Sequence, residues 1–110
     1  MLQLYEWFDK IARILPKHHR YTLGTRICNE LLDILELLLL ASVKGGDSRL
    51  LLLRKVDVRL KLLRLLVRLL HAGRSLTDYK YAEFSERTIV IGQMLGGWIE
   101  ATKGKIRAKP

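Results

Sequence analysis

Apolar residues recur at helical spacing along most of the chain, in four blocks separated by polar or glycine-containing segments. In the first block they lie three or four residues apart and therefore share one helix face: Leu4, Trp7, Phe8, Ile11 and Leu15. Pro16 follows this block directly. Because proline disfavours helical geometry in the residue before it, the first helix is expected to end near Leu15.

The second block predicts a helix over residues 20–43, after a short basic connection at residues 17–21. Its apolar positions cover much more than one stripe: Leu23, Ile27, Leu31, Leu32, Ile34, Leu35, Leu37, Leu38, Leu39, Leu40 and Val43. Residues 44–48, Lys-Gly-Gly-Asp-Ser, predict the clearest turn of the chain. Asp47 or Ser48 is suited to cap a third helix over residues 49–72, and Gly73 is suited to end it.

The third block carries its charge on one side. At 100° per residue, six polar side chains fall in a stripe about 100° wide. They are Arg54, Asp57, Lys61, Arg64, Arg68 and His71. The rest of the circumference is leucine and valine, interrupted mainly by Lys55 and Arg59.

A fourth helix is expected after Gly73, with Ser75 or Thr77 as its cap and apolar positions from Tyr81 to Ile99. Residues 103–110 alternate basic residues without an apolar face, which predicts a flexible basic tail. The chain is therefore divided into a helical domain over residues 1–102 and a tail over residues 103–110.

Four helices with short connections predict an all-α, antiparallel up-down four-helix bundle. The second and third helices are too apolar for a solitary bundle, in which each helix shows a polar outer face. A large exposed apolar patch usually marks an interface, so we expect a homo-oligomer built through these two helices. The alternative is that these leucines form a thick core.

The net charge of +9 on 110 residues indicates which kinds of ligand the bundle attracts. Such a field attracts polyanions, either nucleic acid or an anionic membrane surface, although it also serves simple solubility. Nine basic residues are the candidates for contacts to nucleic-acid phosphates: Lys17, Arg20, Arg54, Lys61, Arg64, Arg68, Lys103, Lys105 and Arg107. The pattern lacks interleaved aromatic residues, so base-specific recognition is not indicated.

The compartment is expected to be the cytoplasm. The first residues include Glu6 and Asp9, which interrupt any apolar leader. The longest uncharged apolar run, residues 37–43, is far shorter than the roughly 20 residues of a membrane span. The single cysteine, Cys28, excludes an internal disulfide and fits a reducing compartment.

The carboxylates and the cysteine do not form a pattern typical of catalysis. Glu30, Asp33 and Glu36 recur every three residues, but a di-iron bundle needs Glu-x-x-His pairs, which this chain lacks. We expect these carboxylates to form a solvated or salt-bridged helix face. Cys28 is expected to be a small buried side chain rather than a nucleophile.

His18 and His19 are expected to point apart, as polar connecting residues or phosphate contacts rather than metal ligands. Gly96 and Gly97 lie within a helical pattern at a cost of about 1 kcal/mol each, which predicts a close helix approach beside Trp98. The same explanation is open for Gly24. We therefore predict no enzyme activity, no metal and no cofactor.

Two segments resemble a known family. Leu15-Pro16-Lys17, Arg20-Tyr21-Thr22-Leu23-Gly24 and Arg26-Ile27 resemble its junction between the first two helices, and residues 92–99, Gly-Gln-Met-Leu-Gly-Gly-Trp-Ile, resemble the end of its fourth helix. This four-helix-bundle family includes proteins encoded in 23S rRNA intervening sequences and the accessory variability determinant, Avd, of diversity-generating retroelements. The similarity extends from Tyr5 to about Lys103.

The Gly-Gly-Trp segment and the basic charge favour the Avd branch. The resemblance then implies a barrel-shaped homopentamer that binds the element's reverse transcriptase and its template RNA, in support of mutagenic retrohoming. It implies no catalytic residues. The alternative is a structural interaction protein of the intervening-sequence type, without a reverse transcriptase partner.

Overall fold

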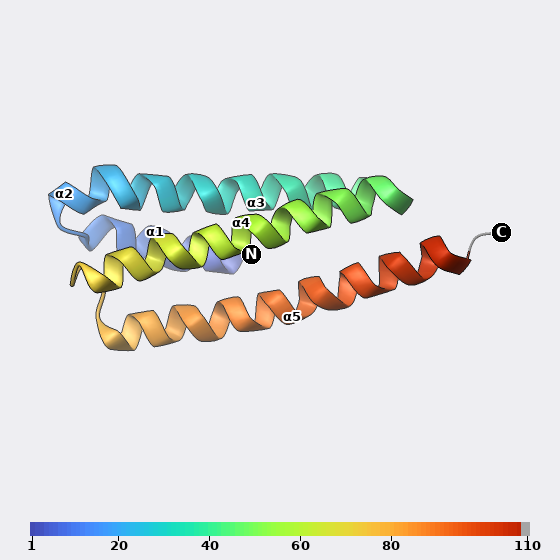
Figure 1. Ribbon diagram of the computed structural model, residues 1–110. Coiled ribbons are helices and arrows are strands. Elements are labelled where there is room, and N and C mark those ends of the chain that lie inside the picture. Colours follow the sequence, from blue (N-terminus) through green and yellow to red (C-terminus); the bar gives the residue numbers. More distant parts are fainter. Residues whose placement is uncertain (109–110) are drawn as a thin grey trace.

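The computed structural model describes residues 1–108, which are helical with short connections and contain no strand. The elements are α1 (Leu2–Ile14), α2 (Lys17–His19), the π-helical turn η1 (Arg20–Gly24), α3 (Thr25–Val43), α4 (Gly46–Ala72) and α5 (Asp78–Ala108). Because α2, η1 and α3 follow without a break, they form one rod. Four rods alternate in direction in a bundle of 56 × 22 × 19 Å (Figure 1), which confirms the predicted all-α four-helix architecture.

The four rods differ greatly in length. Helix α1 has 13 residues and α5 has 31, so α1 accompanies the others for only part of their course. In Figure 1 α1 lies beside the first half of α3, and the N-terminus lies near the middle of the molecule. The bundle therefore has four helices at the end where the chain turns from α4 to α5, and three helices at the opposite end.

The core follows a heptad pattern on α4. Its buried side chains alternate at spacings of three and four residues: Leu53, Val56, Leu60, Leu63, Val67 and Leu70. From the other rods, Phe8 of α1 and Phe84 of α5 are fully enclosed. The Trp7 ring stacks on Phe84 with centroids 6.2 Å apart, which ties α1 to α5. Each such buried side chain contributes about 1.5–3 kcal/mol of hydrophobic stabilisation.

Pro16 ends α1 as predicted, but the basic segment after it is helical. Helix α2 begins at Lys17, so the expected connection at residues 17–21 is wrong. Pro16 is the N-cap residue of α2, where its missing N–H group costs nothing. Gly24 is buried in the π-helical turn, and a Cβ atom there would lie 3.1 Å from Leu15 Cδ1 and 3.2 Å from the His19 carbonyl oxygen. The expected close approach at Gly24 is thus confirmed.

The predicted cap of α4 is wrong and that of α5 is confirmed. Helix α4 begins at Gly46 with Gly45 as N-cap residue, and Asp47 lies in the first turn without capping it. At α5 the Thr77 hydroxyl accepts a hydrogen bond of 3.1 Å from the backbone N–H group of Lys80.

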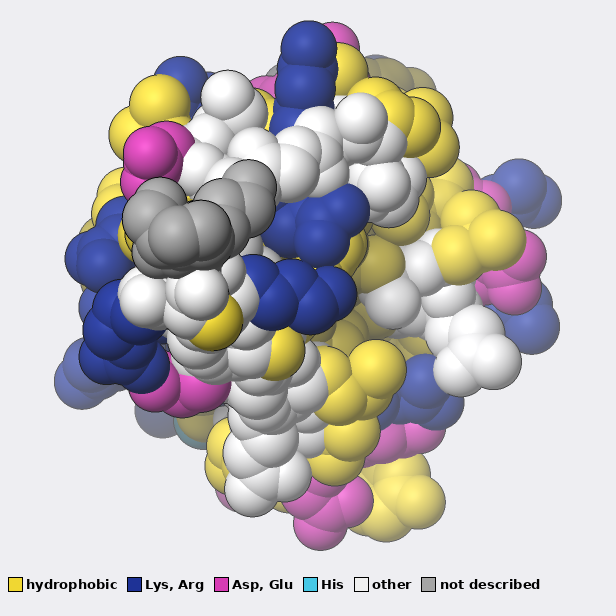
Figure 2. Space-filling model, turned by 90° about the vertical axis from the view of Figure 1, so that its right-hand side faces the viewer, with side chains coloured by type: hydrophobic (Ala, Val, Ile, Leu, Met, Phe, Trp, Pro, Cys, Tyr) yellow, Lys and Arg dark blue, Asp and Glu magenta, His cyan; other side chains and the backbone are white. Residues whose placement is uncertain are grey.

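Helix α5 continues to Ala108, so residues 103–108 of the predicted flexible tail are helical. The remaining residues 109–110 of that predicted tail lie outside the described range. Straight-chain lysine and arginine have good helix propensity, and Lys105 and Arg107 suit the negative end of the helix dipole. The last turns of α5 form part of the three-helix end seen in Figure 2.

Gly96 and Gly97 do not mark a close helix approach. Both are exposed, and within residues 1–108 a Cβ atom added at either position would have no heavy atom of another helix within 4 Å. The expected packing at this pair is therefore wrong. The neighbouring Trp98 is half-buried and lies under the guanidinium of Arg49, 5.6 Å from its ring centroid.

Gly73 ends α4 as predicted, but the left-handed residue is the next one. The Ser75 N–H group donates to the Leu70 carbonyl and the Arg74 N–H group to the His71 carbonyl, which is the Schellman pattern. Arg74 has a φ of 61°, and Gly73 does not have a positive φ. At Gly73 a Cβ atom would instead meet the His19 ring at 3.0 Å.

Arg74→Gly is expected to stabilise the protein by about 1 kcal/mol, because glycine adopts the left-handed conformation without a steric penalty. Chemical unfolding at fixed protein concentration measures the change. Arg74→Ala is the matched control, since alanine removes the guanidinium but keeps the Cβ atom. An equal gain in both variants would contradict the backbone explanation.

Candidate nucleic-acid interface

A row of cations follows the exposed side of α4, as the sequence predicts. Arg54, Lys61 and Arg68 recur every seven residues, and Arg64 lies on the same side; all four are exposed. Seven residues span about 10.5 Å of helix, so the row is regularly spaced. We call these four residues the α4 cation row. Its scaffold is well anchored, because another face of α4 carries the buried heptad positions.

The members of the row differ in their contacts. Lys61 pairs with Asp57 at 3.1 Å. The Arg64 guanidinium donates a hydrogen bond of 3.0 Å to the Thr88 carbonyl oxygen of α5. Arg54 and Arg68 take part in none of the ion pairs among residues 1–108. They are the members whose charge is available to a ligand without breaking an internal contact.

Gly92 leaves space for the Arg64 guanidinium, and sequence reasoning missed this contact. A Cβ atom on Gly92 would lie 3.3 Å from the Arg64 guanidinium. The space admits Arg64 to a hollow of about 320 Å³ between α4 and α5, whose lining also includes Lys61 and Gln93. Gly92 is the first residue of the segment 92–99 that carries the family resemblance. Its contact with Arg64 was not predictable, because sequence spacing relates residues on one helix and not residues on two different helices.

The other five predicted contact residues lie far from the centre of the row. Lys17 is exposed at the start of α2, at the four-helix end. The Arg20 guanidinium donates to the carbonyl oxygens of Arg13 at 2.6 Å and Leu15 at 3.3 Å, so it closes the end of α1. Lys103, Lys105 and Arg107 lie on the last turns of α5, where Lys103 pairs with Glu100 at 3.2 Å. The nine residues thus do not form one patch.

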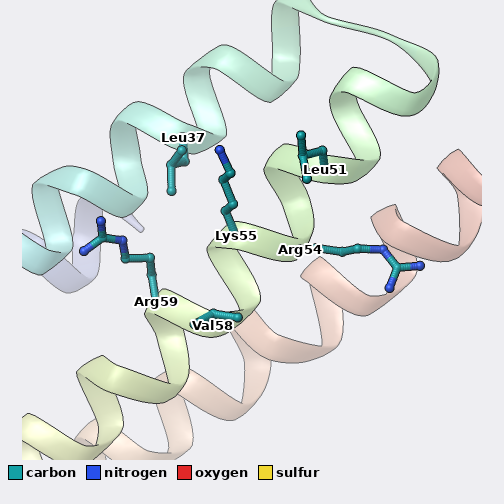
Figure 3. Close-up of a pocket in the computed structure, with 6 residues that line it drawn as sticks. All are labelled: Leu37, Leu51, Arg54, Lys55, Val58 and Arg59. Atoms are coloured by element: carbon teal, nitrogen blue, oxygen red, sulfur yellow. The ribbon is translucent and has the colours of Figure 1, made fainter.

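An apolar stripe runs beside the α4 cation row. Leu51, Val58 and Leu65 also recur every seven residues on α4 and are 57%, 66% and 52% exposed. Leu51 and Val58 line a hollow of about 520 Å³ with Leu37 of α3 (Figure 3). With the exposed leucines of α3 and α4, this stripe confirms that these helices carry more apolar surface than the bundle buries.

Three cations also line this hollow: Arg54, Lys55 and Arg59. In Figure 3 Arg54 points away from Lys55 and Arg59. Arg59 reaches α3, where its guanidinium lies 2.7 Å from Glu30 and 3.7 Å from Asp33. The expected salt-bridged carboxylate face is therefore confirmed for Glu30 and Asp33, whereas Glu36 is exposed.

Glu30 is more deeply buried than its position in that face suggests. Its side chain is 1% exposed, and its second carboxylate oxygen has no hydrogen-bond partner among the described residues. Arg26 lies 3.5 Å from the first oxygen. A buried carboxylate is strongly destabilising unless cations pair with it. The Glu30–Arg59 pair is therefore an ion pair that stabilises the fold rather than a site for a ligand.

The three histidines lie at the four-helix end. His18 and His19 have ring centroids 4.2 Å apart, so the prediction that they point apart is wrong. His19 Nδ1 pairs with the Ser75 hydroxyl, and His71 Nε2 lies 2.6 Å from Asp78 Oδ1. These contacts join α2 to the connection before α5, and the end of α4 to the start of α5.

Cys28 is half-buried, and burial raises the pKa of its thiol, with a smaller effect from the charge of Asp9. The thiol therefore stays protonated near neutral pH, where it is a poor nucleophile. Within residues 1–108, no group of three histidine, cysteine or acidic side chains is placed to hold a metal ion. None of the described helices has a stretch long and apolar enough to cross a bilayer.

The fold is a bundle of four helical rods, and its prominent surface features are the α4 cation row and the apolar stripe beside it. A family model described as bAvd-like matches residues 1–102, and the chain belongs to this family. The family is of the Avd accessory type and is not a known enzyme family. No curated protein and no solved structure matches the chain.

Proposed function

We propose that this protein is a non-enzymatic accessory factor of a diversity-generating retroelement, which binds template RNA and the element's reverse transcriptase. The observation that carries the proposal is the α4 cation row, held on a rigid helix in a chain of the bAvd-like family. Regularly spaced cations neutralise phosphates and release counterions whatever the base sequence. Such a surface suits a factor that gathers a long template rather than one that reads a short motif.

We infer that the protein acts as a homo-oligomer, with five copies expected from the family resemblance. The apolar stripe Leu51, Val58 and Leu65 is the proposed contact between copies. Burial of three such side chains is favourable by several kcal/mol in total, at roughly 25 cal/mol per Å². Because the α4 cation row lies next to this stripe, association would repeat the row around the assembly and raise its effective affinity for RNA.

The double variant Val58→Glu/Leu65→Glu is expected to be monomeric and folded, because it places two carboxylates in the proposed contact while both positions are solvated in the single chain. Native mass spectrometry and light scattering measure the mass. Leu2→Glu/Ile14→Glu is the control with the same change in charge, at exposed positions of α1. Monomers in both variants, or oligomers in both, would contradict the assigned contact.

The proposed partnership with the reverse transcriptase is tested by reconstituting cDNA synthesis. The reverse transcriptase of the proposed element is incubated with template RNA, with and without the protein. We expect template-primed cDNA only when the protein is present, and co-elution of both proteins on gel filtration. Normal synthesis without the protein would contradict the accessory role and favour an interaction protein of the intervening-sequence type.

A further inference from the structure

The groove that holds α1 continues beyond the N-terminal end of α1. Helix α1 packs on α3 and, through Trp7 and Phe84, on α5. Past Met1 the groove is lined by Leu38 of α3, Val56 of α4, and Ile91, Met94, Leu95 and Trp98 of α5. This open groove has a volume of about 290 Å³ and is mainly apolar.

The part of the groove that α1 occupies indicates which kind of segment fits the open part. Helix α1 is amphipathic and buries Leu4, Phe8 and Ile11 there. The open groove lies between the same helices, and its lining on α5 runs from Ile91 to Trp98, which corresponds to about 10 Å of length. It therefore matches about two turns of a second amphipathic helix, collinear with α1.

The positive charge at the three-helix end restricts which kind of partner fits the open groove. Residues 44–49 and 100–107 carry five basic and two acidic side chains, and one of those acids, Glu100, is paired with Lys103. Arg49 lies over the Trp98 ring, donates through Nε to the Ala41 carbonyl at 2.9 Å, and forms no ion pair among residues 1–108. Figure 2 shows lysine and arginine side chains beside apolar ones at this end.

We propose that the open groove docks an amphipathic helix of a partner protein, which places apolar side chains on Met94 and Trp98 and a carboxylate on Arg49. The apolar lining favours a protein helix over RNA. The positive charge disfavours the basic end of α5 from a second copy, since like charges would meet. This docking surface is separate from the α4 cation row and goes beyond the proposed RNA binding.

The test uses the Trp7→Phe protein, in which Trp98 is the only tryptophan. The probe is a peptide of about 15 residues with leucines on one helix face and glutamates on its flanks, a length at which an isolated helix is marginally stable. We expect saturable changes in Trp98 emission. A twin peptide with glutamine for glutamate is expected to bind about tenfold more weakly, because it lacks the charge-assisted hydrogen bond to Arg49.

Met94→Glu and Val90→Glu form the matched pair of variants. Both positions are exposed on α5 and gain the same charge, but only Met94 lines the open groove. Met94→Glu is expected to weaken peptide binding at least tenfold, about 1.4 kcal/mol, and Val90→Glu by no more than about twofold. Absence of saturable binding, equal affinity for both peptides, or equal losses in both variants would overturn the proposal.

A single-stranded RNA competitor separates this proposal from the proposed function. We expect RNA to leave the peptide signal unchanged and to bind Met94→Glu and Val90→Glu equally well. Displacement of the peptide by RNA would assign the groove to the RNA surface and overturn the docking of a helix. Loss of RNA binding with peptide binding intact would contradict the proposed function alone.

Discussion

Arg54→Glu/Arg68→Glu is expected to lower the affinity for template RNA at least a hundredfold at low salt, without unfolding the protein. Both side chains are exposed and without an ion pair among residues 1–108, so the substitution disrupts no internal salt bridge. Each reversal replaces attraction to a phosphate with repulsion. The slope of log affinity against log salt is expected to fall by about 1 for each phosphate that is no longer neutralised. Filter binding over a salt series measures both quantities.

Lys10→Glu/Lys80→Glu is the matched control for net charge. It also reverses two cations, so both variants fall from +9 to +5, but Lys10 lies on α1 and Lys80 at the start of α5. We expect a much smaller loss of affinity in the control, because long-range attraction is weakened equally while the α4 cation row is intact. Equal losses would mean that RNA responds to net charge and that the row has no special role.

Arg59→Met is expected to destabilise the protein by about 2–4 kcal/mol, since it leaves the Glu30 carboxylate buried with only Arg26 at 3.5 Å. Part of Arg59 is solvated, which keeps the loss below that of a fully enclosed pair. For a chain of this length the loss corresponds to a fall in Tm of roughly 10–20 °C. Thermal and chemical unfolding at fixed protein concentration measure it.

Glu30→Met/Arg59→Met completes this cycle. With both charges replaced by apolar side chains of similar size, we expect stability to return to within about 1 kcal/mol of the parent protein. The coupling energy from the four proteins isolates the pair from the packing of each side chain. A double variant as unstable as Arg59→Met would show that Arg59 acts through packing rather than through Glu30.

The hydrophobic pattern predicted most of the fold. Apolar side chains at helical spacing located all four rods, Pro16 marked the end of α1, and Gly73 the end of α4. The α4 cation row was placed on one exposed side because helix geometry alone fixes which residues share a face. These features depend on residues close together in sequence, which is why the pattern predicts them.

Features that depend on contacts between helices were not predictable in the same way. The burial of Glu30 requires Arg59, which is 29 residues away, and the hydrogen bond from Arg20 to the end of α1 requires the chain to turn sharply at Pro16. The basic residues 103–108 lack an apolar stripe but continue a helix that has already formed, which costs less than starting one. Exposed Gly96 and Gly97 have no packing explanation in this structure.

The most direct test of RNA binding is the affinity of the purified protein for a structured template RNA across a salt series. The α4 cation row predicts tight binding at low salt, with log affinity falling linearly and steeply as log salt rises. Absence of binding even at low salt would contradict the central claim. It would assign the positive charge to solubility or to a protein partner.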